Sequence, residues 1–189
     1  MDKPLDGFDQ IDIPTEVPDK KILIFGIPSH IKDMITETVG NARENTVIKY
    51  ICLEENLTVD SVDKSIREEP WSAMFYLGGL VNNLPAKHVM GDILMISQVL
   101  SNLSVSTSIA PLFCLAPINE GKDADTVPKH SGIKGFAKTA RVELENVVGK
   151  LINISSVECH SSLISSPDML ISTVLYISSL FDGKSDNPI

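Results

Sequence analysis

Five short apolar runs recur along the chain, and this pattern constrains the fold more than any other feature. The runs span residues 21–27, 46–53, 72–78, 110–117 and 150–155, and stretches with helical periodicity lie between them. Uninterrupted apolar runs of this length are typical of strands that are covered on both faces. Because strands and helices alternate, we expect a parallel, doubly wound, Rossmann-like α/β sheet.

The intervening stretches carry apolar side chains at helical spacing. In the first, a helix that ends near Gly40 and Asn41 places Ile31, Met34, Ile35 and Thr38 on one face. A short helix is expected over residues 59–69, before Pro70, and a longer one over 88–103, with Val89, Ile93, Ile96, Leu100 and Leu103 on its apolar face. The stretch 131–147 predicts a helix that buries Ile133, Phe136, Ala137, Ala140 and Leu144 and exposes Lys134 and Arg141. Ser166 as N-cap and Pro167 at the first helical position predict the start of a last helix with Leu170, Val174, Ile177 and Phe181 on its apolar face.

Composition divides the chain into three parts and excludes several classes of partner. Residues 1–20 are acidic and contain prolines, as expected of a linker, residues 21–181 form the α/β domain, and residues 182–189 form a polar tail. The formal net charge of −9 opposes binding to a nucleic-acid backbone. No apolar run is long enough to span a membrane, and no secretory signal is expected at the start. We therefore expect a cytoplasmic protein.

The cysteines and histidines show no spacing that suits a metal site. Cys52, Cys114 and Cys159 are widely separated and odd in number, so we interpret them as reduced thiols. The four histidines lie in or beside expected loops, and none of them forms a pair with ligand spacing; they are His30, His88, His130 and His160. We expect no metal site.

The first strand–helix turn lacks the pattern that binds a dinucleotide. In nucleotide-binding folds, glycines at this turn let the backbone approach the phosphates. Here the turn reads Gly26-Ile27-Pro28-Ser29-His30-Ile31-Lys32, and Pro28 removes a backbone donor where donors are needed. A residual phosphate site on Ser29 and Lys32 remains an alternative to an ordinary capped turn. Glu54 and Glu55 stand where an acid can hold a ribose, but without the glycine loop we interpret them as solvated.

The most specific motif is Gly132-Ile133-Lys134-Gly135-Phe136-Ala137-Lys138-Thr139-Ala140-Arg141-Val142-Glu143-Leu144-Glu145, followed by the strand LINIS. It resembles the short-chain dehydrogenase/reductase superfamily. It is most similar to the structural, non-catalytic subdomain of ketoreductases in polyketide and polyunsaturated fatty acid synthases. The runs MFYLGGL (74–80) and APLFCLAP (110–117) agree with this resemblance, which covers residues 21–181.

The chain departs from the active members of that superfamily at their catalytic pair, Tyr-x-x-x-Lys. The resemblance places Thr126 at the tyrosine position and His130 at the lysine position. The three tyrosines, Tyr50, Tyr76 and Tyr176, are followed four residues later by Glu54, Leu80 and Leu180, so the pair is absent at any alignment. A threonine hydroxyl is a poor proton donor at neutral pH. We therefore expect no catalytic residues and no bound cofactor.

The resemblance implies a catalytically inactive subdomain that supports a ketoreductase within a polyketide or fatty acid synthase assembly. The chain would have no activity by itself but would belong to an NADPH-dependent ketoreductase system. Its partner would be the catalytic ketoreductase domain or a neighbouring synthase domain, with self-association as a further option. The expected interface is the apolar set Leu80, Val81, Leu84, Leu163 and Ile164. Two alternatives remain open, namely an atypical reductase-like enzyme and a free-standing ligand-binding regulatory module. These five side chains can also fold back onto their own domain.

Overall fold

The computed structural model of the protein describes residues 20–42, 46–52, 57–81, 84–103, 110–117, 131–136, 138–139, 150–154 and 166–180. The strands are β1 (Lys20–Ile27), β2 (Thr46–Cys52), β3 (Ala73–Tyr76), β4 (Leu112–Pro117) and β5 (Lys150–Ile154). The helices are α1 (Ser29–Ala42), α2 (Val59–Arg67), α3 (Ala86–Leu103) and α6 (Pro167–Leu180), with a 3-10 helix, η1 (Gly78–Leu80), directly after β3. Residues 131–136 and 138–139 are also helical. All five predicted strands are confirmed, but the third ends at Tyr76, two residues earlier than expected, because Leu77 is already the N-cap of η1.

The strands form one sheet in the order β2-β1-β3-β4-β5, and every neighbouring pair is parallel. The predicted parallel, doubly wound α/β sheet is therefore confirmed. The chain moves from β1 to β2 in one direction across the sheet and afterwards returns past β1 to β3, β4 and β5. The direction reverses between β1 and β3, and in open sheets of this kind ligands bind at the carboxyl ends of the strands beside such a reversal.

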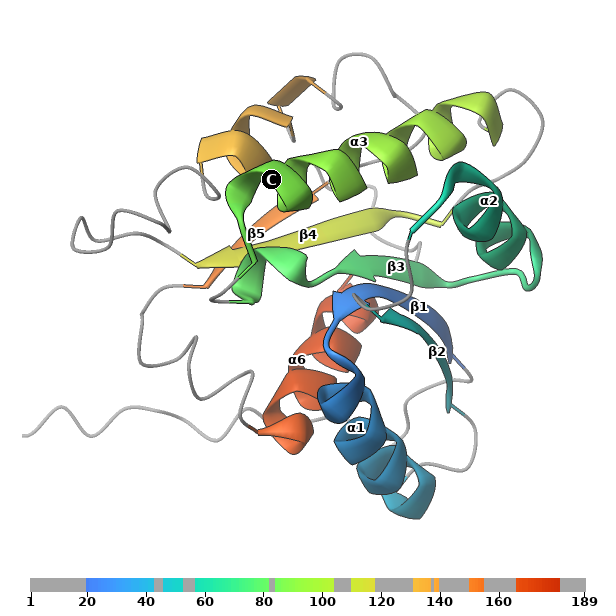
Figure 1. Ribbon diagram of the computed structural model, residues 1–189. Helices are drawn as coiled ribbons and strands as arrows, with labels where there is room; N and C mark the ends of the chain where they lie inside the picture. The colour runs from blue at the N-terminus through green and yellow to red at the C-terminus, as the bar shows by residue number, and fades with distance from the viewer. Residues whose placement is uncertain are drawn as a thin grey trace, which may run out of the picture.

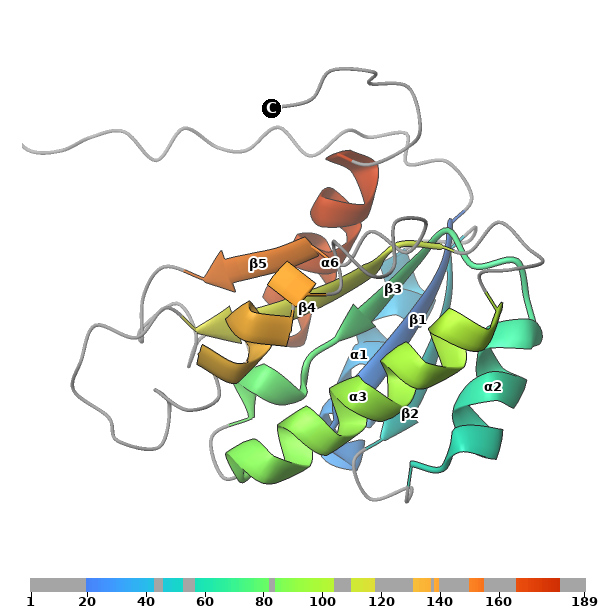
Figure 2. The ribbon, with the colours of Figure 1, turned by 90° about the horizontal axis from the view of Figure 1, so that it is seen from above.

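The helices cover both faces of the sheet, as the handedness of the crossovers requires. Helices α1 and α6 lie on one face, whereas α2, α3 and helical residues 131–139 lie on the other (Figures 1 and 2). Right-handed crossovers place a helix on one face when the chain moves one way across the sheet and on the opposite face when it moves back. Helix α1 belongs to the step from β1 to β2, whereas α2 and α3 belong to steps in the opposite direction and therefore lie on the opposite face. Helix α6, which follows β5, lies on the same face as α1.

Alternate residues of the strands supply two separate cores. On the α2–α3 side, strand residues such as Leu23, Phe25, Met74 and Tyr76 are buried against Val62, Val89, Ile93, Ile96, Leu100 and Ile133. On the α1–α6 side, Ile22, Ile24 and Phe75 are buried against Ile31, Ile35, Leu170, Val174 and Ile177. The alternation follows from the two-residue period of a strand and explains why the runs are apolar throughout.

The expected apolar faces of the helices are confirmed at most of the described positions. All five residues predicted for the face of α3 are buried, and so are Leu170, Val174 and Ile177 of α6. Met34 is a correction, because it is 39% exposed while Ile31 and Ile35 of the same helix are buried. In the 131–139 segment Ile133 is buried, Phe136 is partly buried and Lys134 is exposed. Phe181, Ala137, Ala140, Arg141 and Leu144 lie outside the described residues or side chains.

Local polar contacts fix the ends of α2, which the sequence placed only approximately. Thr58 caps the helix, because its hydroxyl accepts from the Ser61 amide (3.2 Å) while the Ser61 hydroxyl accepts from the Thr58 amide (3.0 Å). After the helix, Glu69 pairs with Lys21 at 2.5 Å and Glu68 pairs with Lys49. These two pairs connect the end of α2 to the neighbouring strands β1 and β2. None of the helices that the structure describes is both long enough and apolar enough to cross a membrane.

Candidate functional site

The turn between β1 and α1 is shaped by the chain's own side chains. Gly26 has a φ of +78°, a conformation that side-chain-bearing residues rarely adopt. A Cβ atom built on Gly26 would lie 2.9 Å from the Tyr76 ring and 3.0 Å from the Gly78 amide nitrogen. The single glycine of this turn is therefore required by the close approach of β3 and η1.

Helix α1 begins directly after this turn, with Pro28 as the residue before it. The Pro28 carbonyl accepts from the amides of Ile31 (3.0 Å) and Lys32 (3.2 Å). Ser29 and Lys32, the residues of the alternative phosphate site, are both partly buried and both engage in polar interactions within the chain. Helix α1 thus begins with the Ile31 and Lys32 amides directed back at the Pro28 carbonyl.

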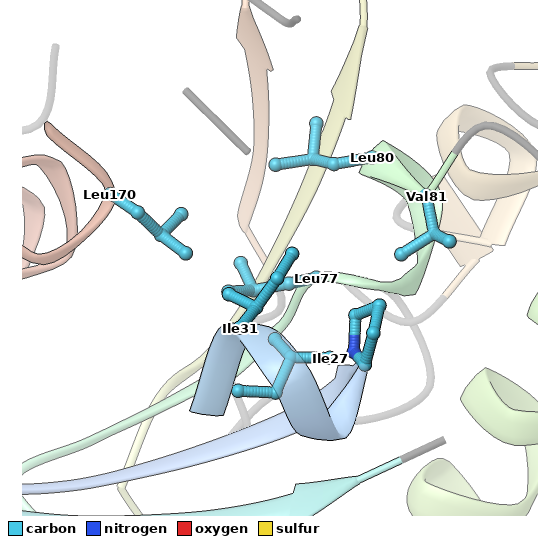
Figure 3. A pocket seen from close by; sticks show the side chains of 7 residues that line it. Ile27, Ile31, Leu77, Leu80, Val81 and Leu170 are labelled. Atoms are coloured by element: carbon cyan, nitrogen blue, oxygen red, sulfur yellow. The ribbon is translucent and has the colours of Figure 1, made fainter. Parts of the chain in front are cut away.

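On the α1–α6 side, apolar side chains fill the crevice where β1 and β3 end. Figure 3 shows these side chains converging from β1, α1, η1 and α6, and the lining consists of Ile27, Pro28, Ile31, Leu77, Leu80, Val81 and Leu170. The cavity that remains has a volume of about 10 Å³, which is near the minimum for one water molecule. Every side chain of this described lining is apolar, so this part of the crevice offers no side-chain hydrogen bond to a ligand.

On the α2–α3 side of the sheet, Tyr76 lies at the carboxyl end of β3. Its side chain is fully buried, and its hydroxyl donates to the Asp92 carboxylate of α3 at 3.1 Å. Burial raises the pKa of Tyr76, and the negative charge of Asp92 raises it further. A side chain at Gly78 would collide with the Tyr76 hydroxyl, so Gly78 is also required by this ring.

Asp92 is the acid that sequence reasoning missed. Partial burial raises the pKa of its carboxyl, while the hydrogen bond from Tyr76 and the nearby His88 oppose that shift. His88 lies one helical turn before Asp92 and is exposed. The spacing of His88 and Asp92 on one helix was visible in the sequence, but the partnership with Tyr76 depends on the packing of α3 on β3. Within the described residues, no group of three or more potential ligands could hold a metal ion.

The structure does not gather the other residues singled out in the sequence. His30 is exposed at the start of α1, and Cys52 and Cys114 are buried free thiols. Burial raises the pKa of the Cys114 thiol to about 12. The remaining residues singled out for chemistry lie outside the described residues; they are Glu54, Glu55, Thr126, His130, Cys159 and His160.

The expected interface residues are divided between the crevice and parts of the chain outside the description. Leu80 is 1% exposed, so it offers no surface to a partner and packs within its own domain. Val81 and Leu84 are partly buried, and Leu84 packs against the core beneath α2 and α3. Leu163 and Ile164 lie outside the described residues. The surface around Val81 and Leu84 is the part of the prediction that can still meet a partner.

No model of a protein family matches the chain, and no curated protein matches it at a significant level.

Proposed function

We propose that the chain is a catalytically inactive domain derived from a short-chain reductase, which supports a catalytic ketoreductase domain in a polyketide or fatty acid synthase assembly. The observation that carries the proposal is the filled crevice between the ends of β1 and β3. A dinucleotide bound there needs space beside the first turn and polar groups for its phosphates. The chain instead supplies seven apolar residues and a cavity of about 10 Å³.

The strand order is compatible with the proposed descent. The standard dinucleotide-binding sheet has the order 3-2-1-4-5-6. Removal of strand 3 at one edge of that sheet leaves the order 2-1-4-5-6. Renumbering of the remaining strands then gives the order 2-1-3-4-5 that is found here. The same order also occurs in flavodoxin-like sheets. The helix motif that begins at Gly132 favours the truncated reductase sheet of the two.

The position of Tyr76 supports the absence of reductase chemistry. A tyrosine that donates a proton to a substrate carbonyl must reach the substrate, and its pKa must be lowered toward neutral pH. Tyr76 is instead fully buried, its hydroxyl proton is directed at Asp92, and burial raises its pKa. A structural role for this tyrosine agrees with a domain that supports catalysis elsewhere. The proposed setting is the cytoplasm, with the catalytic domain or a neighbouring synthase domain as partner.

The proposal is tested by association with the catalytic ketoreductase domain of the same synthase system. Light scattering of the two proteins, alone and mixed, should give a mass equal to the sum of one copy of each. The double variant Val81→Asp with Leu84→Asp should weaken this complex, whereas Met169→Asp, on the exposed side of α6, should leave it intact. Leu80 is unsuitable for this test because it is buried. Val81 also lines the crevice and Leu84 packs against the core, so thermal unfolding of the double variant must show that it remains folded before weakened binding counts as loss of the interface. A chain whose mass is unchanged by the catalytic domain has no supporting role.

A further inference from the structure

The outward side of α3 carries an exposed leucine that the fold does not use. Leu94 is 59% exposed, the largest exposed fraction of any large apolar side chain that the structure describes. Gly91 and Lys87 are exposed about one and two turns before it, respectively. We call the exposed residues Lys87, Gly91, Leu94, Lys134, Gly135 and Lys138 the α3 outer face.

Two glycines of this face have no structural reason within the described chain. Gly91 lies in the interior of α3, and Gly135 lies within the helical segment 131–136. A Cβ atom at either position would have nothing within 4 Å. Glycine is among the least favourable residues in a helix interior, so alanine would be preferred at both positions if only the fold mattered. Each glycine leaves backbone open to close approach from outside.

The two helices place these residues side by side. Gly132 contacts α3 directly, because a Cβ atom on it would lie 2.6 Å from the Met90 sulfur. Both helices connect parallel strands on the same face of the sheet, so they run in the same direction (Figures 1 and 2). Gly132 and Met90 are thus in contact, and Gly135 and Leu94 each lie about one turn further along their own helices. The result is a face formed by two adjacent helices that carries an exposed apolar side chain.

The described charged residues that are exposed on this face are all lysines, although the protein as a whole is strongly acidic. Lys87, Lys134 and Lys138 are exposed, and none of them forms an ion pair or hydrogen bond with another described residue. The nearest carboxylate on α3 belongs to Asp92, which is partly buried and accepts from Tyr76. The chain as a whole carries a formal charge of −9. Three exposed lysines that pair with no described residue, close to one exposed leucine, are complementary to an acidic partner.

We propose that the α3 outer face is a docking site for an acidic amphipathic helix of a partner protein. A third helix can pack its side chains against a face formed by two adjacent parallel helices. Gly91 and Gly135 let its backbone approach, Leu94 supplies the apolar contact, and the three lysines meet acidic side chains at the rim. The site is independent of the crevice at β1 and β3 and of the role proposed above.

The test uses two synthetic amphipathic peptides of about 18 residues, or five helical turns. One has Glu on its polar face and Leu and Ala on the other, and its counterpart has Lys in place of every Glu. Fluorescence anisotropy with the full chain should show binding of the acidic peptide, weaker at high salt, and no binding of the basic one. Leu94→Asp should weaken binding about tenfold or more. Gly91→Leu should weaken it similarly while raising the melting temperature of the chain, which separates loss of the site from loss of the fold.

The matched control is Met169→Asp, an exposed apolar residue on the opposite side of the sheet, which should bind as the unaltered chain does. The proposal is overturned if the acidic peptide binds no better than the basic one, or if Leu94→Asp and Met169→Asp have equal effects. A dimer in light scattering that Leu94→Asp dissociates would also overturn it, because the occupant would then be a second copy of this chain.

Discussion

The substitution Gly26→Ala should destabilise the protein strongly because the glycine is enclosed by its own chain. Two terms contribute. An alanine at a φ of +78° adopts a left-handed conformation, which costs about 1–2 kcal/mol. Its Cβ atom would also meet the Tyr76 ring at 2.9 Å and the Gly78 backbone at 3.0 Å, and overpacking of this kind costs about 1–3 kcal/mol.

The total is about 3 kcal/mol, because the Tyr76 ring cannot move away easily. Its hydroxyl is bonded to Asp92, and Gly78 lies against it on the other side. For a chain of this size, 1 kcal/mol corresponds to a shift of about 2–4 °C in melting temperature. Gly26→Ala should therefore lower the melting temperature by about 6–12 °C.

Gly91→Ala is the matched control, because it introduces the same methyl group into a helix position with nothing within 4 Å. It should stabilise the chain by about 1 kcal/mol. Both variants are measured by thermal and urea unfolding followed by circular dichroism. A neutral or stabilising Gly26→Ala would refute the reasoning, since it would mean that the turn keeps space for a ligand and not for Tyr76.

The other predictions concern the buried polar groups beneath α3. The pKa of the Asp92 carboxyl in the folded state is raised above its ordinary value of 3.8. The protonated carboxyl therefore contributes its full stabilisation at pH values below 3.8, and this stabilisation is lost as the pH rises through the folded-state pKa. Asp92→Asn should therefore stabilise the chain more at pH 7 than at pH 4 in urea unfolding, and an equal effect at both would contradict this. Cys114, whose thiol pKa is raised to about 12 by burial, should resist iodoacetamide at pH 8 in the native chain and react on unfolding, as peptide mapping can show. Ile133→Ala should lower the free energy of unfolding by about 2–5 kcal/mol because Ile133 is buried. Lys134→Ala should lower it by less than about 0.5 kcal/mol because Lys134 is exposed. Similar losses for the two variants would mean that the helix register is wrong.

The sequence predicted the strands correctly because continuous apolar runs indicate strands that are buried on both faces. The runs that became β1 to β5 are continuous and apolar because helices cover both faces of the sheet, and their alternation with helices already indicated parallel strands. The third run was misjudged at its end. Its apolar residues continue through Leu77 to Leu80, but from Gly78 onward they belong to a 3-10 turn that folds back into the crevice.

The contents of the crevice could be predicted only in part. The single glycine and Pro28 indicated that the first turn lacks a phosphate loop. The sequence did not show that Leu80 would turn inward, because exposed and buried leucines in a loop look alike without the packing around them. The Tyr76–Asp92 bond was likewise hidden, since it joins residues on a strand and a helix whose relative rotation is set by the whole core.

If the ends of β1 and β3 are closed to a dinucleotide, calorimetric titration of NADPH and NADH into the full chain will detect no binding. We predict no saturable heat up to millimolar concentration for either nucleotide. Thermal unfolding in the same solutions should show no shift, whereas a ligand at a hundred times its Kd would stabilise the chain by about 2.7 kcal/mol. A saturable, stoichiometric heat with NADPH that is abolished by Lys32→Ala would contradict the account.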